Sequence, residues 1–279
     1  MKLLKIFIIP VAAAALFGCT DYPIYDLTRP VSKKSILLIT DWTNRGSGID
    51  IPSSYTVKIG DYSTTLSGTV NSVEDLFAGA GQYTINIWNT TDNIAVSDRI
   101  ATADYKSGDL GWFFTGKQEV AIEKDKAYSI TVPMQQQVRQ LTLELDVTGD
   151  AKERLKSINA SLSGVAGTLN IDNGTHDTPV DVALTFYKDP SDGKWKVTVR
   201  LLGMTDKGQT LTLVLNFADD NPSSYILSSD MSSLLAGFNE DKKTPLILSA
   251  RLVVTPAATG FAATITNWIP GGASTGVAE

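Results

Sequence analysis

Cysteine and histidine most often supply nucleophilic, redox or metal chemistry in proteins, and each occurs once in this chain, as Cys19 and His176. A lone thiol cannot close an internal disulfide. One histidine cannot build the three- or four-ligand site that zinc or copper takes. His176 lies in a polar, turn-rich stretch, DNGTHDTP, where we expect an exposed loop histidine without a catalytic role. The chemistry expected at Cys19 therefore needs the thiol alone.

The residues before Cys19 indicate how its thiol is used. Two lysines precede an almost wholly apolar run, residues 6–17, which suits the core of an export signal and is too short to span a bilayer. The sequence LFGC (16–19) resembles the bacterial lipobox, where signal peptidase II cleaves before a diacylated cysteine. We predict a lipoprotein signal peptide at 1–18 and acylation (palmitate) of Cys19, which anchors an exported protein without a membrane-spanning helix. The alternative is an ordinary export signal with an incidental cysteine.

The charge of the chain, −6 at pH 7, bears on its partners. Nucleic acid binding needs clustered Lys and Arg, so we expect no nucleic-acid partner. Two acidic loops lack the D-x-[DN]-x-[DN]-G spacing of a calcium loop, so we read them as solvated turns. They carry Asp172, Asp177, Asp219 and Asp220. We predict no metal site, no other cofactor, no catalytic residues and no enzyme activity.

Period-two alternation of apolar and polar residues dominates the rest of the chain and predicts antiparallel strands. In LTLELDV (141–147) the apolar residues all face one side. YTINIW (83–88) and AYSITVP (127–133) alternate in the same way, and we expect Pro133 to end the second run. The sequence DPSDG (189–193) predicts the turn of a hairpin between two apolar rows, and Gly60-Asp61 predicts another.

Helical signals are few and short, at residues 71–77, 150–158 and 228–238. The sequence therefore predicts an all-β fold of two tandem antiparallel β-sandwich domains with short crossover helices, and favours sandwiches over a barrel. The polar stretch PMQQQVRQ (133–140) marks the expected boundary. The domains are a tether at 19–34, an N-terminal sandwich at 35–134 and a C-terminal sandwich at 135–279. One continuous sandwich is the alternative.

Several stretches resemble the fimbrillin-like anchor lipoproteins of type V pili, the FimB/Mfa group. They are the lipobox ending in Cys19, residues 36–63, LTLELDVTG with SINASLSGVAGTLNI, and TITNWIPGG. The resemblance implies two transthyretin-like sandwiches in tandem. It also implies a structural protein of the fimbrium base at the cell surface, lipid-anchored in the outer membrane, with pilins as partners.

Pilus subunits join when an extended segment of one fills a groove in another. Three stretches are candidates for such a joint, 32–42, 246–255 and 261–269, with ordinary core strands as the alternative reading. Their candidate strand-exchange residues are Ile36, Leu38, Leu252, Val254 and Ile265. The terminal PGGASTGVAE has no alternating apolar row, so it is predicted to be a poor donor strand. This fits an end subunit of the fimbrium, or a terminus that is simply frayed.

A different class of function is also open, a surface lipoprotein that binds a glycan on a sandwich face. Exposed Trp42, Trp88 or Trp112 would supply the stacking surface for sugar rings. A third hypothesis is that the protein is a hydrolase, which requires two carboxylates that converge in a cleft.

Overall fold

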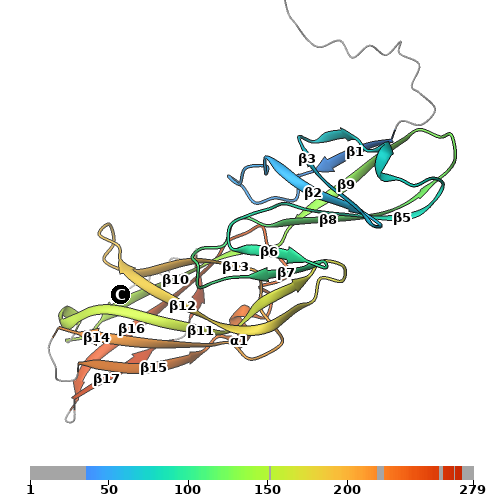
Figure 1. Cartoon of the computed structure of the whole chain (residues 1–279). Helices are drawn as coiled ribbons and strands as arrows, with labels where there is room; N and C mark the ends of the chain where they lie inside the picture. The colour runs from blue at the N-terminus through green and yellow to red at the C-terminus, as the bar shows by residue number, and fades with distance from the viewer. Residues whose placement is uncertain (1–35, 151, 219–222, 258–259, 267, 272–279) are drawn as a thin grey trace, which may run out of the picture.

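The computed structural model describes residues 36–150, 152–218, 223–257, 260–266 and 268–271. The predicted signal peptide (1–18), Cys19, the tether and most of the terminal PGGASTGVAE lie outside these residues, as do Asp219 and Asp220. Figure 1 shows an elongated molecule in which two β-sheets lie end to end. The all-β prediction is confirmed.

The first sheet has seven strands in the order β3-β2-β5-β8-β9-β1-β4. Strand β1 pairs parallel with β9 and antiparallel with the short β4. The strands are β1 (Ile36–Asp41), β2 (Ser54–Ile59), β3 (Tyr62–Ser67), β4 (Val70–Ser72), β5 (Gly81–Trp88), β8 (Phe114–Ile122) and β9 (Tyr128–Gln136).

The second sheet has eleven strands, eight of them in the order β15-β14-β11-β12-β13-β10-β16-β17. Strand β18 pairs with β16, while β6 pairs with β7 and β7 with β11. The strands are β6 (Ile94–Ser97), β7 (Ile100–Ala103), β10 (Arg139–Thr148), β11 (Leu155–Asn170), β12 (His176–Lys188), β13 (Trp195–Leu201), β14 (Thr210–Phe217), β15 (Ser224–Asp230), β16 (Leu246–Ala257), β17 (Gly260–Ile265) and β18 (Ile269–Pro270).

The second sheet curls almost into a barrel, because its two end strands, β15 and β17, contact each other. Trp268, just after β17, is buried and donates a hydrogen bond from Nε1 to Ser229 Oγ of β15 at 3.1 Å. No ladder between β15 and β17 occurs in the described strands. The sheet therefore has a seam there, closed by side chains.

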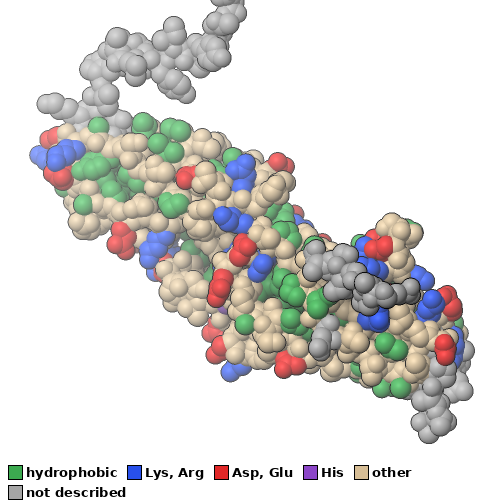
Figure 2. All heavy atoms as spheres, turned by 180° about the vertical axis from the view of Figure 1, so that it is seen from behind, with side chains coloured by type: hydrophobic (Ala, Val, Ile, Leu, Met, Phe, Trp, Pro, Cys, Tyr) green, Lys and Arg blue, Asp and Glu red, His purple; other side chains and the backbone are tan. Residues whose placement is uncertain are grey.

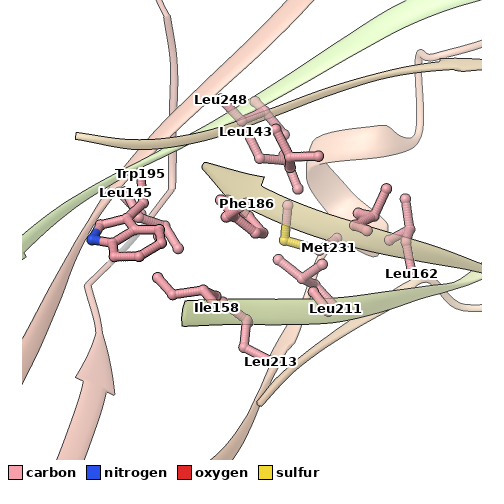
Figure 3. Packing of buried hydrophobic residues seen from close by; sticks show 14 of the residues in the cluster. Leu143, Leu145, Ile158, Leu162, Phe186, Trp195, Leu211, Leu213, Met231 and Leu248 are labelled. Atoms are coloured by element: carbon pink, nitrogen blue, oxygen red, sulfur yellow. The ribbon is translucent and has the colours of Figure 1, made fainter. Parts of the chain in front are cut away.

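The strand faces follow the alternation of the sequence. Leu141, Leu143 and Leu145 of β10 are fully buried, and Thr142 and Glu144 between them lie on the other face. Figure 3 shows Leu143 and Leu145 pointing into one space with residues from β11, β12, β13, β14 and β16. Each such buried side chain stabilises the fold by roughly 1.5–3 kcal/mol.

Two predictions about local structure are wrong. Residue 151 lies outside the described residues, and the rest of 150–158 forms only a 3-10 turn, Lys152–Arg154, before β11 begins at Leu155. Tertiary packing decides this, because Leu155 and Ile158 are both buried in the core of the second sheet. The other two helical signals also give a single turn each, at Glu74–Leu76 and in α1 (Ser232–Leu235).

The second wrong prediction concerns Pro133, which does not end β9. Proline has no N–H to give to a ladder. The pairing of β9 with β1 stops at Pro133, and its pairing with β8 starts at Met134. The strand therefore changes neighbours at the proline and continues to Gln136.

The predicted hairpin at DPSDG is confirmed, with Gly193 at φ 74° in the turn. Only two residue pairs join its strands, Tyr187 with Lys196 and Lys188 with Trp195. Beyond them β12 pairs with β11 and β13 pairs with β10, so the hairpin opens into the curved sheet.

The chain passes from the first sheet to the second between β9 and β10, within the predicted boundary stretch. Residues 94–103, however, lie within the predicted N-terminal sandwich and pair with the second sheet through β7. The parallel pairs β1–β9 and β10–β16 also depart from a purely antiparallel arrangement. The division into two transthyretin-like sandwich domains stays a prediction.

Candidate functional site

The candidate strand-exchange residues are integral parts of the sheets. Ile36 and Leu38 are buried in β1, between β9 and β4. Leu252 and Val254 are buried in β16, between β10 and β17. Ile265 is partly buried in β17, an end strand of the second sheet. A joint at β1 or β16 would require a paired strand to leave, whereas β17 lies at the seam.

The tryptophans do not form the exposed platform that the glycan reading requires. Trp42 is 4% exposed, donates from Nε1 to Thr40 Oγ1 at 2.9 Å, and packs against Phe114 with ring centroids 5.5 Å apart. Its predicted exposure is wrong, because a turn residue can fold its ring back into the core. Trp88 and Trp112 are partly buried, and the Arg200 guanidinium carbon lies 5.5 Å from the Trp112 ring centroid.

A pocket of about 680 Å³ lies where the two sheets meet. One wall is the loop after β1, and the other is the loop before β16. The residues that line it are Arg45, Gly46, Ser47, Gly48, Ile49, Trp112, Gln136, Gln140, Lys242, Lys243, Thr244 and Pro245.

Gln136 holds the two walls together at the end of β9. Its Oε1 accepts a hydrogen bond from Gly46 N at 2.8 Å. Its Nε2 donates to Val138 O at 2.8 Å and to Lys242 O at 2.6 Å. The side chain is 4% exposed, so these bonds are shielded from water. One amide thus fixes both loops relative to the crossing between the sheets.

Arg139, the first residue of β10, makes hydrogen bonds to the loop before β16. It donates from Nε to Thr244 O at 2.7 Å and from Nη1 to Phe238 O at 3.1 Å. Its guanidinium carbon also lies 5.1 Å from the Phe238 ring centroid. Burial lowers the pKa of this arginine from its usual value. The contacts order the loop that presents Lys242.

Lys242 is the most unusual charge of the pocket. Its Nζ donates to Gln137 Oε1 at 2.5 Å, a neutral partner. In the part of the chain that the structure describes, no carboxylate lies within 4.0 Å of this amine. Burial lowers the pKa of Lys242 to about 8. The sequence gives no local signal for this environment, since it depends on segments far apart in the chain.

His176, expected to be exposed, is partly buried at the start of β12. Its Nε2 is buried and has no hydrogen-bond partner among the described residues. The ring packs so closely on Gly203 that a Cβ there would lie 2.3 Å from Cδ2. Burial, followed by the charge of Lys242, lowers the pKa of His176 to about 4. The imidazole is therefore neutral at pH 7.

This depressed pKa makes acid sensitivity a testable consequence. Between pH 6.5 and 4 the unfolded state binds a proton at His176 that the folded state does not, so stability falls as pH falls through this window. Allowing for partial exposure, we expect a loss of about 1–2 kcal/mol in the free energy of unfolding. Urea titrations of wild type and His176→Gln at pH 7 and pH 4 isolate the histidine. Equal losses in both proteins would contradict this prediction.

The first acidic loop is ordered by contacts of Asp172 and Asp177, and the second, with Asp219 and Asp220, lies outside the described residues. Asp172 forms an ion pair with Arg99 at 2.8 Å, and Asp177 Oδ1 accepts from Thr178 N at 2.6 Å. Within the described ranges, no three His, Cys, Asp or Glu side chains converge as a metal site would require. No helix among those residues is long and apolar enough to cross a bilayer.

Comparison with known protein families and structures identifies the chain. The family model described as "Fimbrillin-A associated anchor proteins Mfa1 and Mfa2" matches residues 58–270. A search of curated protein sequences finds no match.

Several solved structures share the fold. The fimbrial anchor protein Mfa2 from Porphyromonas gingivalis is 10% identical, with a TM-score of 0.58 over 85% of this chain and 97% of that chain. A candidate adhesin from Bacteroides ovatus is 17% identical, with a TM-score of 0.59 over 84% and 94%. A candidate polysaccharide-binding protein from Bacteroides thetaiotaomicron is 11% identical, with a TM-score of 0.53 over 84% and 96%. Because the family model spans most of the chain, the protein belongs to the fimbrillin-A associated anchor proteins Mfa1 and Mfa2.

Proposed function

We propose that this protein holds a fimbrium on the outer membrane, through lipid on Cys19 at one end and a strand-mediated joint with a pilin at the other. Membership of the anchor family supports the role. The observation that carries the geometry is the position of β1, the described strand nearest Cys19 in the chain. It lies at the opposite end of the molecule from the seam between β15 and β17 (Figure 1).

The β15–β17 seam has the properties that strand addition needs. Strand β15 pairs with β14 alone among the described strands, and its other edge contacts β17 through side chains rather than through a ladder. This edge accepts an extended segment once those side-chain contacts part. Ile226 in the middle of β15 is 64% exposed. Ile265, the candidate residue of β17, lies across this seam. We therefore place the joint at the seam rather than at β1 or β16.

The joint can be trapped through an engineered thiol. With Cys19 acylated, the Ile226→Cys variant carries one free cysteine, to which a photo-activatable cross-linker is attached on native cells. We expect its outer membranes to yield a heat-labile high-mass species on a cold detergent gel, and a pilin adduct that survives boiling after cross-linking. The matched control is Tyr187→Cys, also an exposed apolar residue (55%), on β12 away from the seam, and it should give no adduct.

Two outcomes would overturn parts of this proposal. If only a species near 30 kDa is found in cells that bear fimbriae, the proposed joint with a pilin does not exist. Adducts of equal yield from both cysteine variants would show that the joint is not at the seam. Separately, Cys19→Ala should release the protein from membranes, and retention there would refute the lipid anchor.

The anchoring role is structural, so we infer no enzyme activity and no cofactor. This is supported by the family, whose description names anchor proteins. The pilin that it holds is inferred only as a class, an extended-strand donor or acceptor of the fimbrium.

A further inference from the structure

The pocket between the sheets concentrates positive charge that the anchoring role does not use. Arg45, Lys242 and Lys243 all line it, and none of its lining residues is acidic. This is unexpected in a chain of net charge −6. On the face in Figure 2, by contrast, acidic and basic side chains are interspersed. The local field of the pocket therefore favours an anion.

Arg45 is positioned by the backbone before any ligand arrives. Its Nε donates to Ile49 O at 3.0 Å, and its Nη1 donates to Trp42 O at 3.0 Å. No partner of Nη2 occurs among the described residues. A guanidinium held in this way has little side-chain freedom left to lose when its remaining N–H groups bind a planar anion.

Lys242 adds a cation whose burial has no structural compensation. Lys242 is partly buried, and an ammonium in such a position without a carboxylate partner among the described residues pays a desolvation cost that its amide acceptor on Gln137 does not offset. A carboxylate entering the pocket would supply the missing charge. The pKa of Lys242, which burial lowers to about 8, is what this uncompensated position is expected to give.

The other lining residues fit a hydroxyl-rich ligand. Ser47 and Gln140 carry polar side chains, and Trp112 adds an aromatic surface. The volume of about 680 Å³ lies within the range of about 300–1,000 Å³ typical of small-ligand pockets. A saccharide has both the hydroxyl groups and the apolar C–H surface that such a lining binds.

We propose that the pocket formed by Arg45, Lys242, Lys243 and Trp112 binds an acidic saccharide, with the carboxylate of a uronic acid between the arginine and Lys242. This inference does not depend on the strand joint, because the pocket lies at the junction of the sheets and the joint lies at the β15–β17 seam. The protein would then hold the fimbrium and also bind a carboxylated glycan.

The experiment is a titration of the full lipoprotein, in detergent, with a trigalacturonate probe, followed by calorimetry and by tryptophan fluorescence. We expect saturable binding that weakens with added salt, since Arg45 and Lys243 are exposed and their interactions with an anion are screened. Lys242→Gln should weaken binding at least tenfold, and Lys243→Gln by a smaller factor. Lys156→Gln, an exposed lysine on β11 outside the pocket, removes the same charge and should bind as wild type.

Further probes separate the sources of binding. Neutral trigalactose should not bind, and inorganic phosphate should not displace the uronate at equal concentration. Displacement of the uronate by phosphate would show that the pocket binds simple anions rather than a saccharide. Binding that is unchanged in both Lys242→Gln and Lys243→Gln would show that the ligand does not bind at this pocket. Because Lys243 is exposed, Lys243→Gln tests the pocket even if Lys242→Gln fails to fold.

Discussion

Phe114→Ala is expected to lower the free energy of unfolding by about 3–5 kcal/mol, the usual loss when a buried phenylalanine is truncated. Phe114 is fully buried at the start of β8, and its ring meets that of Trp42 edge to face at 78°. Truncation leaves a cavity in the core of the first sheet and removes one of the two aromatic rings that pack against Trp42. Since whole domains are stable by only about 5–15 kcal/mol, this is a large fraction of the total.

Urea titration followed by tryptophan emission measures this loss, because Trp42 lies beside the cavity. The matched control is Leu37→Ala on β1 of the same sheet, where the side chain is 37% exposed and the loss should stay below about 1 kcal/mol. Similar losses in the two variants would show that the first sheet does not depend on the core around Phe114.

Gln136→Ala is the second substitution with a large expected effect, because it removes the hydrogen bonds that join the two loops of the pocket. It leaves the Gly46 N–H and the carbonyls of Val138 and Lys242 without the partner that they have now. A buried polar group that loses its partner costs about 1–3 kcal/mol. We expect a stability loss of at least this size, and faster amide hydrogen exchange in residues 42–49 and 242–245.

Hydrogen exchange read by mass spectrometry locates the effect, since peptides from β10 and β11 should keep their protection. Gln118→Ala is the matched control, because this partly buried glutamine donates only to the carbonyl of its neighbour Glu119. Unchanged exchange in both pocket loops of Gln136→Ala would show that the amide is not what holds them together.

Strand faces and turns could be predicted from the sequence because their signals are local. The alternation of Leu141, Leu143 and Leu145 identifies the buried face of β10 directly. Gly193 and Gly60 mark turns at φ 74° and 57° because a residue without Cβ adopts such angles at low cost. Such patterns need no knowledge of the partner strand.

The predictions from sequence are wrong where contacts with residues distant in the chain determine the local structure. Residues 150–158 carry a helical pattern, yet Leu155 and Ile158 gain more by joining β11 and the core of the second sheet. Trp42 follows a strand in a loop sequence, and only the position of Tyr55 and Phe114 shows that its ring is buried. Tertiary packing overrides local preference in both places.

The pocket could not be predicted for the same reason. Arg45, Trp112 and Lys242 are separated by more than sixty residues from one another, and none belongs to a motif. They meet because β9 leads directly into β10, which brings the loop after β1 against the loop before β16. Only the hydrogen bonds of Gln136 and Arg139 reveal that these loops form one structure.

The parallel pairing of β1 with β9 has a mechanical consequence. The register runs from Ile36 opposite Tyr128 to Asp41 opposite Pro133, so the chain enters at one end of this pair and leaves for the second sheet at the other. Tension applied between β1 and the second sheet would pull these two strands past each other lengthwise. Every hydrogen bond of the ladder would then resist at once, rather than breaking one after another as in a zipper. A sheet built in this way resists lengthwise tension without unravelling from its N-terminal strand.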